Sequence, residues 1–297
     1  MKPLRIVRCH KSRFDALVDY IAATNPIAQH HIGYFGLTPE DIRATLRMLS
    51  LPYDRAFRLA LDGNHIVGVL GADIDLSIGR AWLYGPLVTA EQWDATADAL
   101  YSAAVERLPG AIREHEMFVD ADNGRAAAFA ARHAFATYGE WAVYYLTPDR
   151  LAVLPPAEAQ PWDGRYAAQL DALHQRLFPS SNYTLDYMLK TLAEKPEETV
   201  LLVAAEGDAL TGYFFGRVEP EAAEAYVDLV GVDEGARGTG LGRRLMLAGL
   251  DRMHAHEGIR QVNLTVAAGN DPAIRLYDAL GFNRERNMIA FRKMLEE

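Results

Sequence analysis

The chain has 297 residues, 50% of them hydrophobic and 24% charged, which is the composition of an ordinary globular protein and excludes disordered, collagen-like and coiled-coil classes. Its 40 acidic and 30 basic side chains give a net charge of -10, which disfavours a nucleic-acid partner and fits a cationic or amine ligand better. The single cysteine, Cys9, cannot form an intrachain disulfide or a multi-cysteine zinc site, and we expect no metal. Without a signal peptide or an apolar stretch of about 18 residues, we expect a cytoplasmic protein with no membrane partner.

The two halves of the chain repeat one pattern. Phe57–Gly71 is typical of a strand, a glycine turn and a second strand, and Val200–Gly216 has the same pattern. Four positions recur, the first two after 144 residues and the last two after 147: Gly63, Gly68, Asn123 and Phe135 correspond to Gly207, Gly212, Asn270 and Phe282. Two nearly equal offsets indicate an internal duplication.

A proline-rich segment, Thr147–Asp163, separates these halves and contains four prolines. Because proline removes a backbone donor and disfavours helix in the residue before it, we interpret residues 147–163 as a linker. The predicted domains are therefore residues 1–146 and 164–297.

The second half alternates strands with helices. Helices are expected at 165–177, 185–193, 241–255 and 272–280, and strands at 200–205, 210–218, 226–232, 261–267 and 288–294. This order predicts the α/β class, with a mixed, largely antiparallel sheet flanked by helices in each half.

The loop Arg237–Gly242 follows a hydrophobic strand and leads directly into a helix. Its glycines allow bare N–H groups to approach a ligand, and the helix N-terminus favours a phosphate or pyrophosphate. It is no Walker loop, because Arg243 rather than lysine follows Gly242. A dinucleotide fingerprint needs an acidic residue at a strand end about 20 positions later, whereas Glu257 ends a helix. The remaining pattern is Arg-x-x-Gly-x-Gly.

This loop, together with NDPAIRLYDALGF from Asn270, makes the second half resemble the GNAT superfamily of acyl-CoA-dependent N-acyltransferases. The strong resemblance covers about Val200–Met294. The first half resembles the same fold only in outline, so the chain resembles a tandem GNAT protein with a degenerate first domain.

The resemblance implies acetyl-CoA as the cosubstrate and assigns residues to it. The strand residues Leu229, Val230 and Val232 would hydrogen-bond the pantetheine arm. The pyrophosphate would be held by the loop residues Arg237, Gly238, Thr239, Gly240, Leu241 and Gly242. Asn270 would contact the cofactor near its pantetheine portion. Tyr277 would protonate the departing thiolate. The plainer alternatives are that Asn270 caps a helix and that Tyr277 is a core aromatic.

The reaction also requires a base, because an ammonium has no lone pair with which to attack a thioester. Asp228 is the candidate, since it interrupts an apolar strand beside the expected thioester; it could also attract a cationic amine or make a structural hydrogen bond. Some relatives carry a glutamate on the next strand, where this chain has Thr265. Phe178, Tyr183 and Tyr187 match the helix-loop-helix over the acceptor site and are the substrate-binding candidates.

The first half lacks these elements. Its strand Trp82–Val88 is followed by TAEQWDATADAL, without the glycines and arginine of the cofactor loop, and Ala130 stands where Tyr277 stands in the second half. We expect this half to bind no acyl-CoA and to complete the substrate pocket or a dimer interface, so a homodimer stays open.

The sequence thus predicts an N-acyltransferase that moves acetyl from acetyl-CoA to a primary amine of a small molecule by direct attack. A non-catalytic acyl-CoA sensor and a protein N-terminal or lysine acetyltransferase remain alternatives. Aminoacyl transfer from charged tRNA is disfavoured by the retained glycine loop and by the acidic charge.

Overall fold

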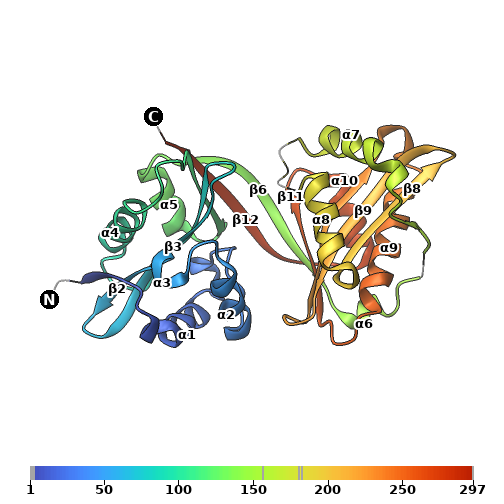
Figure 1. Cartoon of the computed structure of the whole chain (residues 1–297). Helices are drawn as coiled ribbons and strands as arrows, with labels where there is room; N and C mark the ends of the chain where they lie inside the picture. The colour runs from blue at the N-terminus through green and yellow to red at the C-terminus, as the bar shows by residue number, and fades with distance from the viewer. Residues whose placement is uncertain (1–3, 156, 180, 182, 296–297) are drawn as a thin grey trace. The chain divides into compact units, whose positions relative to one another are not determined.

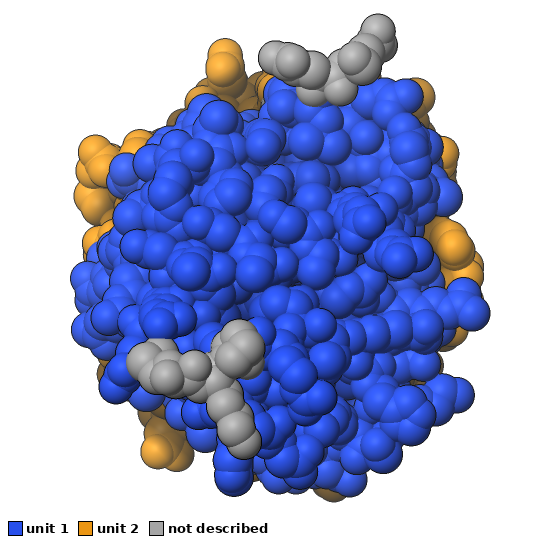
Figure 2. Space-filling view, turned by 90° about the vertical axis from the view of Figure 1, so that its left-hand side faces the viewer, with its two compact units in different colours: residues 1–141, 286–297 blue, residues 142–285 orange. Residues whose placement is uncertain are grey.

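The computed structural model describes residues 4–155, 157–179, 181 and 183–295, and the chain divides into two compact units (Figure 1). Unit 1 comprises residues 1–141 and 286–297 and unit 2 residues 142–285, coloured separately in Figure 2. Among the described residues, no helix has both the length and the apolar character needed to cross a membrane.

Unit 1 starts with an edge strand and two helices. Its elements are β1 (Arg5–Arg8), α1 (Phe14–Thr24), α2 (Pro39–Met48), α3 (Tyr53–Ala56), β2 (Arg58–Asp62), β3 (His65–Asp75), β4 (Arg80–Val88), α4 (Trp93–Val105), β5 (Glu114–Asp120), α5 (Gly124–Arg132) and the first part of β6 (Ala136–Leu146).

Unit 2 repeats the series. Its elements are the rest of β6, α6 (Pro148–Leu151), β7 (Gln160–Pro161), α7 (Ala167–Leu177), α8 (Leu185–Glu194), β8 (Thr199–Glu206), β9 (Ala209–Glu219), β10 (Glu224–Val232), α9 (Leu241–His254), β11 (Gln261–Ala267), α10 (Asp271–Leu280) and the first residues of β12 (Asn283–Met294).

The repeated positions play the same structural part in both units. Gly63 and Gly207 turn the β2–β3 and β8–β9 hairpins with φ of 59° and 60°, in the left-handed region that favours glycine. Asn123 and Asn270 cap α5 and α10, accepting hydrogen bonds from the third backbone N–H beyond them at 3.1 and 3.4 Å. The fold is a duplicated one.

Each unit contains a mixed, largely antiparallel sheet, as predicted. The strand order is β1-β2-β3-β4-β5-β12 in unit 1 and β6-β11-β10-β9-β8-β7 in unit 2. Each sheet contains a parallel pair, β4 with β5 and β10 with β11, and a helix connects the strands of each pair as a parallel crossover requires.

Each sheet takes its last strand from the other half of the sequence. Met288–Met294 pair with β5 inside unit 1, whereas Ala142, Tyr144 and Leu146 of β6 lie in the core of unit 2. The compact units therefore differ from the predicted division at residues 142–146 and 286–297, because β6 and β12 are long enough to pass from one unit to the other. The division into folding domains stays a prediction.

Residues 147–163, interpreted from sequence as a linker, contain ordered structure of unit 2. Leu151 of α6 is buried in the core, and Pro161 pairs with Leu202 at the edge of the sheet. The prolines are tolerated there because Pro148 stands in the first turn of α6, where an N–H is unpaired in any case, and Pro161 stands in an edge strand.

The sheet of unit 2 is covered on both faces. One apolar cluster joins it to α9 and α10 through residues such as Leu245, Tyr277 and Leu280. The second cluster joins it to α7 and α8 through Leu173 and Met188. These two faces, called the α9/α10 face and the α7/α8 face below, separate the predicted site residues.

Candidate active site

The β10 strand loses its partner halfway along. Its parallel pairing with β11 runs from Glu224 to Val227, opposite Gln261–Leu264, although both strands continue. Asp228 forms a bulge there, since Val227 pairs with Gly216 of β9 and Leu229 with the adjacent Phe215. Beyond the bulge no described strand pairs with the β11-facing side of residues 229–232, called the open edge below. An open edge can hydrogen-bond an extended ligand as an added strand.

The open edge leads into the glycine loop. After β10 the chain makes a short 3₁₀ turn (Glu234–Ala236), and α9 begins behind Gly240. Gly238 and Gly240 have φ of 78° and 83°, and a Cβ added at either would meet nothing within 4 Å. The loop therefore has both the left-handed backbone and the free space that a ligand held by backbone N–H groups needs.

The start of α9 favours an anion. No side chain caps its first N–H groups and no acidic residue stands in its first turn, so its positive end is uncompensated. The half-exposed side chain of Arg237 adds a cation, although it also lies 3.8 Å from Glu234. A pyrophosphate fits this charge pattern.

Tyr277 projects from α10 into the α9/α10 face. It is 9% exposed, and its ring lies 6.2 Å from Tyr144 and 5.8 Å from Phe282 between centroids. Burial raises the pKa of the Tyr277 hydroxyl to about 12, so it holds its proton at neutral pH. A general acid must hold its proton before the reaction, and the protonated phenol of Tyr277 meets this requirement.

Asp228 lies on the α7/α8 side and is fully engaged. Its Oδ2 accepts a hydrogen bond from Arg217 Nε at 2.8 Å, and its Oδ1 accepts one from Arg217 Nη2 at 3.0 Å. Oδ1 also accepts from the Tyr183 hydroxyl at 2.9 Å. The carboxylate is 5% exposed, so this ion pair is a buried one.

The three substrate-binding candidates separate into two groups. Tyr183 and Tyr187 lie together, with ring centroids 5.3 Å apart, and both approach Phe215 of β9. Phe178 instead approaches His174 of α7 at 5.6 Å. The structure therefore brings Tyr183, Tyr187 and Asp228 together on the α7/α8 side, while Tyr277 belongs to the opposite face. The open edge begins at the bulge between them.

Sequence reasoning missed two polar residues beside this site. Arg217 was not considered, although its register opposite Tyr226 places it on the same stretch of hairpin as Asp228. His174 is buried at 4% exposure, bonds the Tyr213 hydroxyl through Nδ1 at 2.7 Å, and has its pKa lowered by burial. A histidine on the buried face of an amphipathic helix is the signal that could have located it.

Unit 1 has the same interruption, and there a segment of its own chain pairs with β5. The β4–β5 pairing ends at Trp82 and Glu116. Beyond it, Ile32 forms an antiparallel bridge with Val119, whose other side pairs with Ile289 of β12. The segment His31–Gly33, called the inserted segment below, adds bonds from Gly33 N–H to the Phe118 carbonyl (2.8 Å) and from Asp120 N–H to the His31 carbonyl (3.2 Å).

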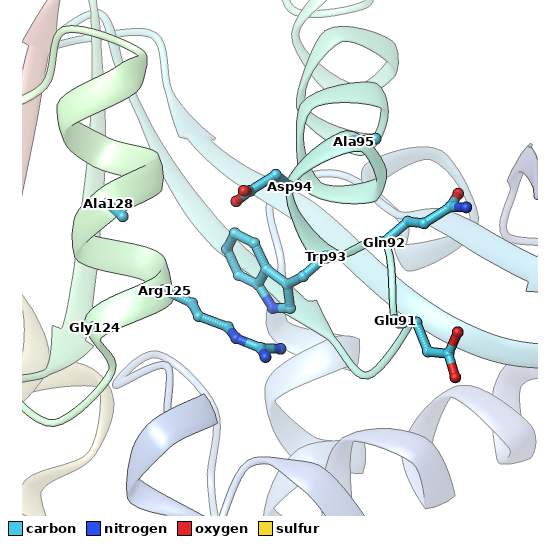
Figure 3. A pocket seen from close by; sticks show the side chains of 8 residues that line it. All are labelled: Glu91, Gln92, Trp93, Asp94, Ala95, Gly124, Arg125 and Ala128. Atoms are coloured by element: carbon cyan, nitrogen blue, oxygen red, sulfur yellow. The ribbon is translucent and has the colours of Figure 1, made fainter.

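The remaining positions in unit 1 also differ. Tyr34 and Phe35 follow the inserted segment directly. Their ring centroids lie 5.3 and 5.2 Å from the ring centroid of Tyr84 on β4. The part of unit 1 that corresponds to the glycine loop of unit 2 is the start of α4. There a cavity of about 530 Å³ lies between the starts of α4 and α5 (Figure 3). The Trp93 indole and Arg125 stand between the two helices there, with Asp94 and Glu91 nearby.

Comparison with known proteins agrees with this geometry. The profile of the acetyltransferase (GNAT) family matches residues 167–282. A mycothiol acetyltransferase of Kineococcus radiotolerans is 33% identical over 198 residues, which are 61% of this chain and 62% of the relative. That of Thermobispora bispora is 34% identical over 134 residues, 41% of this chain and 44% of the relative. The matches thus cover less than two thirds of either relative.

Solved structures match the fold along the whole chain. A GCN5-related N-acetyltransferase from Sphaerobacter thermophilus has a TM-score of 0.71 at 16% identity, covering 100% of this chain and 97% of its own. A tandem GNAT protein from the clavulanic acid biosynthesis pathway has a TM-score of 0.66 at 21% identity, covering 99% of both chains. The chain has the tandem GNAT fold, and its second half belongs to the GNAT family of acetyltransferases.

Proposed function

We propose that this protein is a cytosolic N-acyltransferase that moves an acetyl group from acetyl-CoA to a primary amine of a small molecule. Unit 2 performs the reaction. The observation that carries the proposal is the continuity of the open edge with the glycine loop and the uncapped start of α9, in a segment that matches an acetyltransferase family. Together these elements fit a ligand with an extended amide-containing arm and a pyrophosphate.

In this proposal the cofactor residues act through their backbone. Leu229, Val230 and Val232 of the open edge pair with the pantetheine arm, and the N–H groups of Arg237–Gly242 surround the pyrophosphate. Asn270 already caps α10, so any contact with the cofactor is made by a side chain that is fixed in place.

The chemical step forms one bond and breaks another. The neutral amine nitrogen bonds to the thioester carbon, and the carbon–sulfur bond breaks with its electron pair on sulfur. Tyr277 gives its hydroxyl proton to that sulfur and regains one from water, while the nitrogen releases a proton to solvent. Because the high pKa keeps Tyr277 protonated, the group is ready as an acid at each turnover.

The acceptor enters from the α7/α8 side, where Tyr183 and Tyr187 stand beside the bulge. Phe178 packs against the same apolar cluster and approaches His174 of α7. A small-molecule amine is supported by the relatives, which are named for the acetylation of mycothiol.

Tyr277→Phe tests the proposal. Acetyl-CoA binding is measured by calorimetry, and turnover by thiol release with spermidine, glucosamine and a lysine-containing peptide as acceptor probes. We expect unchanged acetyl-CoA affinity and turnover lower by roughly 100-fold, because the leaving thiolate loses its proton donor. Tyr144→Phe, a buried tyrosine next to Tyr277, is the matched control and should retain full turnover.

The alternatives give different results. Tight acetyl-CoA binding without turnover of any probe would support an acyl-CoA sensor, and turnover of the peptide alone would support a protein acetyltransferase. Full activity in Tyr277→Phe would remove this residue from the acid role.

A further inference from the structure

A buried polar arrangement outside the cofactor elements surrounds Asp228. Its two carboxylate oxygens accept three hydrogen bonds, two from Arg217 and one from Tyr183, at 2.8 to 3.0 Å. Oδ1 accepts two of these bonds and Oδ2 accepts one, so donors on both oxygens fix the orientation of the carboxylate.

Arg217 is itself held from several directions. Its guanidinium lies 6.0 Å from the ring centroid of Tyr183 and 5.7 Å from that of Tyr226, and it also bonds Glu219 at 3.3 Å. Burial alone would lower the pKa of Arg217, but the hydrogen bonds and charge of Asp228 raise it above its ordinary value. The cation is therefore permanent, and its planar fork fixes both oxygens of Asp228.

Tyr183 connects this ion pair to a helix. It lies just before Thr184, the residue that caps α8 by accepting from Tyr187 N–H at 3.1 Å. Burial and the charge of Asp228 raise the pKa of the Tyr183 hydroxyl, which therefore remains a donor. The bond to Asp228 thus fastens the start of α8 to the sheet at the bulge.

We propose that Arg217, Asp228 and Tyr183 form a positioning clamp that holds the start of α8 over the bulge and so shapes the acceptor site. The effect of the clamp on acceptor binding rests on the proposed function. Its effect on the stability of the start of α8 does not. Asp228 acts through Tyr183 as a fixed anion, and the proton of the amine goes to solvent rather than to this carboxylate.

Hydrogen exchange tests the clamp without any acceptor. In Tyr183→Phe, the amides of Tyr187 and Met188 in the first turn of α8 should exchange about 10-fold faster, because one tether to the sheet is lost. Tyr166→Phe, which changes another buried tyrosine of unit 2 outside the clamp, should leave their exchange unchanged. Unchanged exchange in Tyr183→Phe would overturn the clamp whether or not the protein proves to be an acyltransferase.

Kinetics separates positioning from proton transfer. With the best of the three acceptor probes, Tyr183→Phe and Asp228→Asn should each raise the acceptor KM about 10-fold, with kcat changed less than about threefold and the pH profile unmoved. The double variant should be little worse than either single one, because both act on the same hydrogen bond: Tyr183→Phe removes its donor and Asp228→Asn removes the charge of its acceptor. A kcat about 100-fold lower in Asp228→Asn, with a profile shifted to higher pH, would make Asp228 the base and overturn the proposal.

Discussion

The two units begin their parallel strand pairs alike and continue them differently. In unit 1 the pairing ends at Trp82, and the inserted segment His31–Gly33 then bonds to β5. In unit 2 it ends at Val227, and the open edge follows. Because unpaired backbone groups inside a protein are unfavourable, a duplicate that binds no cofactor needs another partner for its strands. In unit 1 the inserted segment is that partner for β5, the strand that corresponds to β11, whereas the open edge of unit 2 belongs to β10.

The loop regions differ in the same direction. α9 follows a connection with two left-handed glycines and has no acidic residue in its first turn, whereas α4 starts directly after Gln92 and carries Asp94 there. Ala130, fully buried on α5, stands where α10 has Tyr277. Among the described residues, the glycine loop and the tyrosine are therefore found in unit 2 and not at the matching positions of unit 1, and we propose one acyl-CoA site per chain.

The largest expected effect comes from ending the chain at Glu285. Unit 1 would lose Met288–Met294, which pair with β5 and bury Met288, Ala290 and Phe291. Removing a whole strand and three buried side chains should destabilise unit 1 by about 5 kcal/mol or more. Urea unfolding followed by tryptophan fluorescence reports mainly on unit 1, because three of the four tryptophans, Trp82, Trp93 and Trp141, lie there.

A chain ending at Met294 is the control, since it keeps β12 intact and should lose less than about 1 kcal/mol. If the chain ending at Glu285 unfolded at the same urea concentration as the full chain, unit 1 would not depend on its borrowed strand.

Acid should destabilise unit 1 next most strongly. Burial, together with the nearby charge of Arg286 for His31 and of Lys293 for His115, lowers the pKa of each histidine to about 4. Their unfolded values are about 6.5, so between pH 6.5 and 4 the unfolded chain binds more protons. Stability should therefore fall as the pH falls through this window, by up to roughly 1.4 kcal/mol per pH unit for each histidine, and level off below it.

The same fluorescence assay at several pH values measures this slope. His115→Gln should reduce it, whereas His65→Gln, at an exposed position of β3, should leave it unchanged. A slope that survives substitution of both His31 and His115 would have to come from other titratable groups.

Gly240→Glu tests where acetyl-CoA binds. A carboxylate at this open, left-handed position would crowd and repel a pyrophosphate, so the Kd measured by calorimetry should rise by roughly 100-fold or more, about 2.7 kcal/mol. Gly258→Glu is the matched control, because Gly258 has φ of 86° and is equally open but lies outside the site. A full-strength site remaining in Gly240→Glu would refute the assignment of the pyrophosphate to the glycine loop and break the comparison.

Much of unit 2 was predictable because its signals are local. Hydrophobic periodicity located α7, α9 and β11 within two residues, and the glycine spacing located the loop. The duplication was predictable because the turn glycines and cap asparagines recur at a nearly constant sequence offset, even where the surface residues of the two halves differ.

The remainder depends on contacts between residues far apart in sequence. Nothing in the residues around Ile32 indicates pairing with Val119, because a single bridge leaves no periodic pattern. The sequence also does not indicate which sheet β6 and β12 join, since their pattern of apolar and polar residues would be the same in either sheet. The engagement of Asp228 by Arg217 depends on a bulge that shifts the hairpin register by one residue.

The smallest predicted difference concerns the two caps. Asn270→Ala should cost about 0.5–1 kcal/mol, the usual value for an exposed cap. Asn123 is 2% exposed, and its Nδ2 also donates to the His31 carbonyl at 3.4 Å, so Asn123→Ala should cost about 2 kcal/mol. The unfolding assay compares the two, and calorimetry checks whether Asn270→Ala also weakens acetyl-CoA binding. The extra cost at Asn123 measures what its bond to the His31 carbonyl contributes to holding the inserted segment; equal costs would mean that this bond contributes nothing.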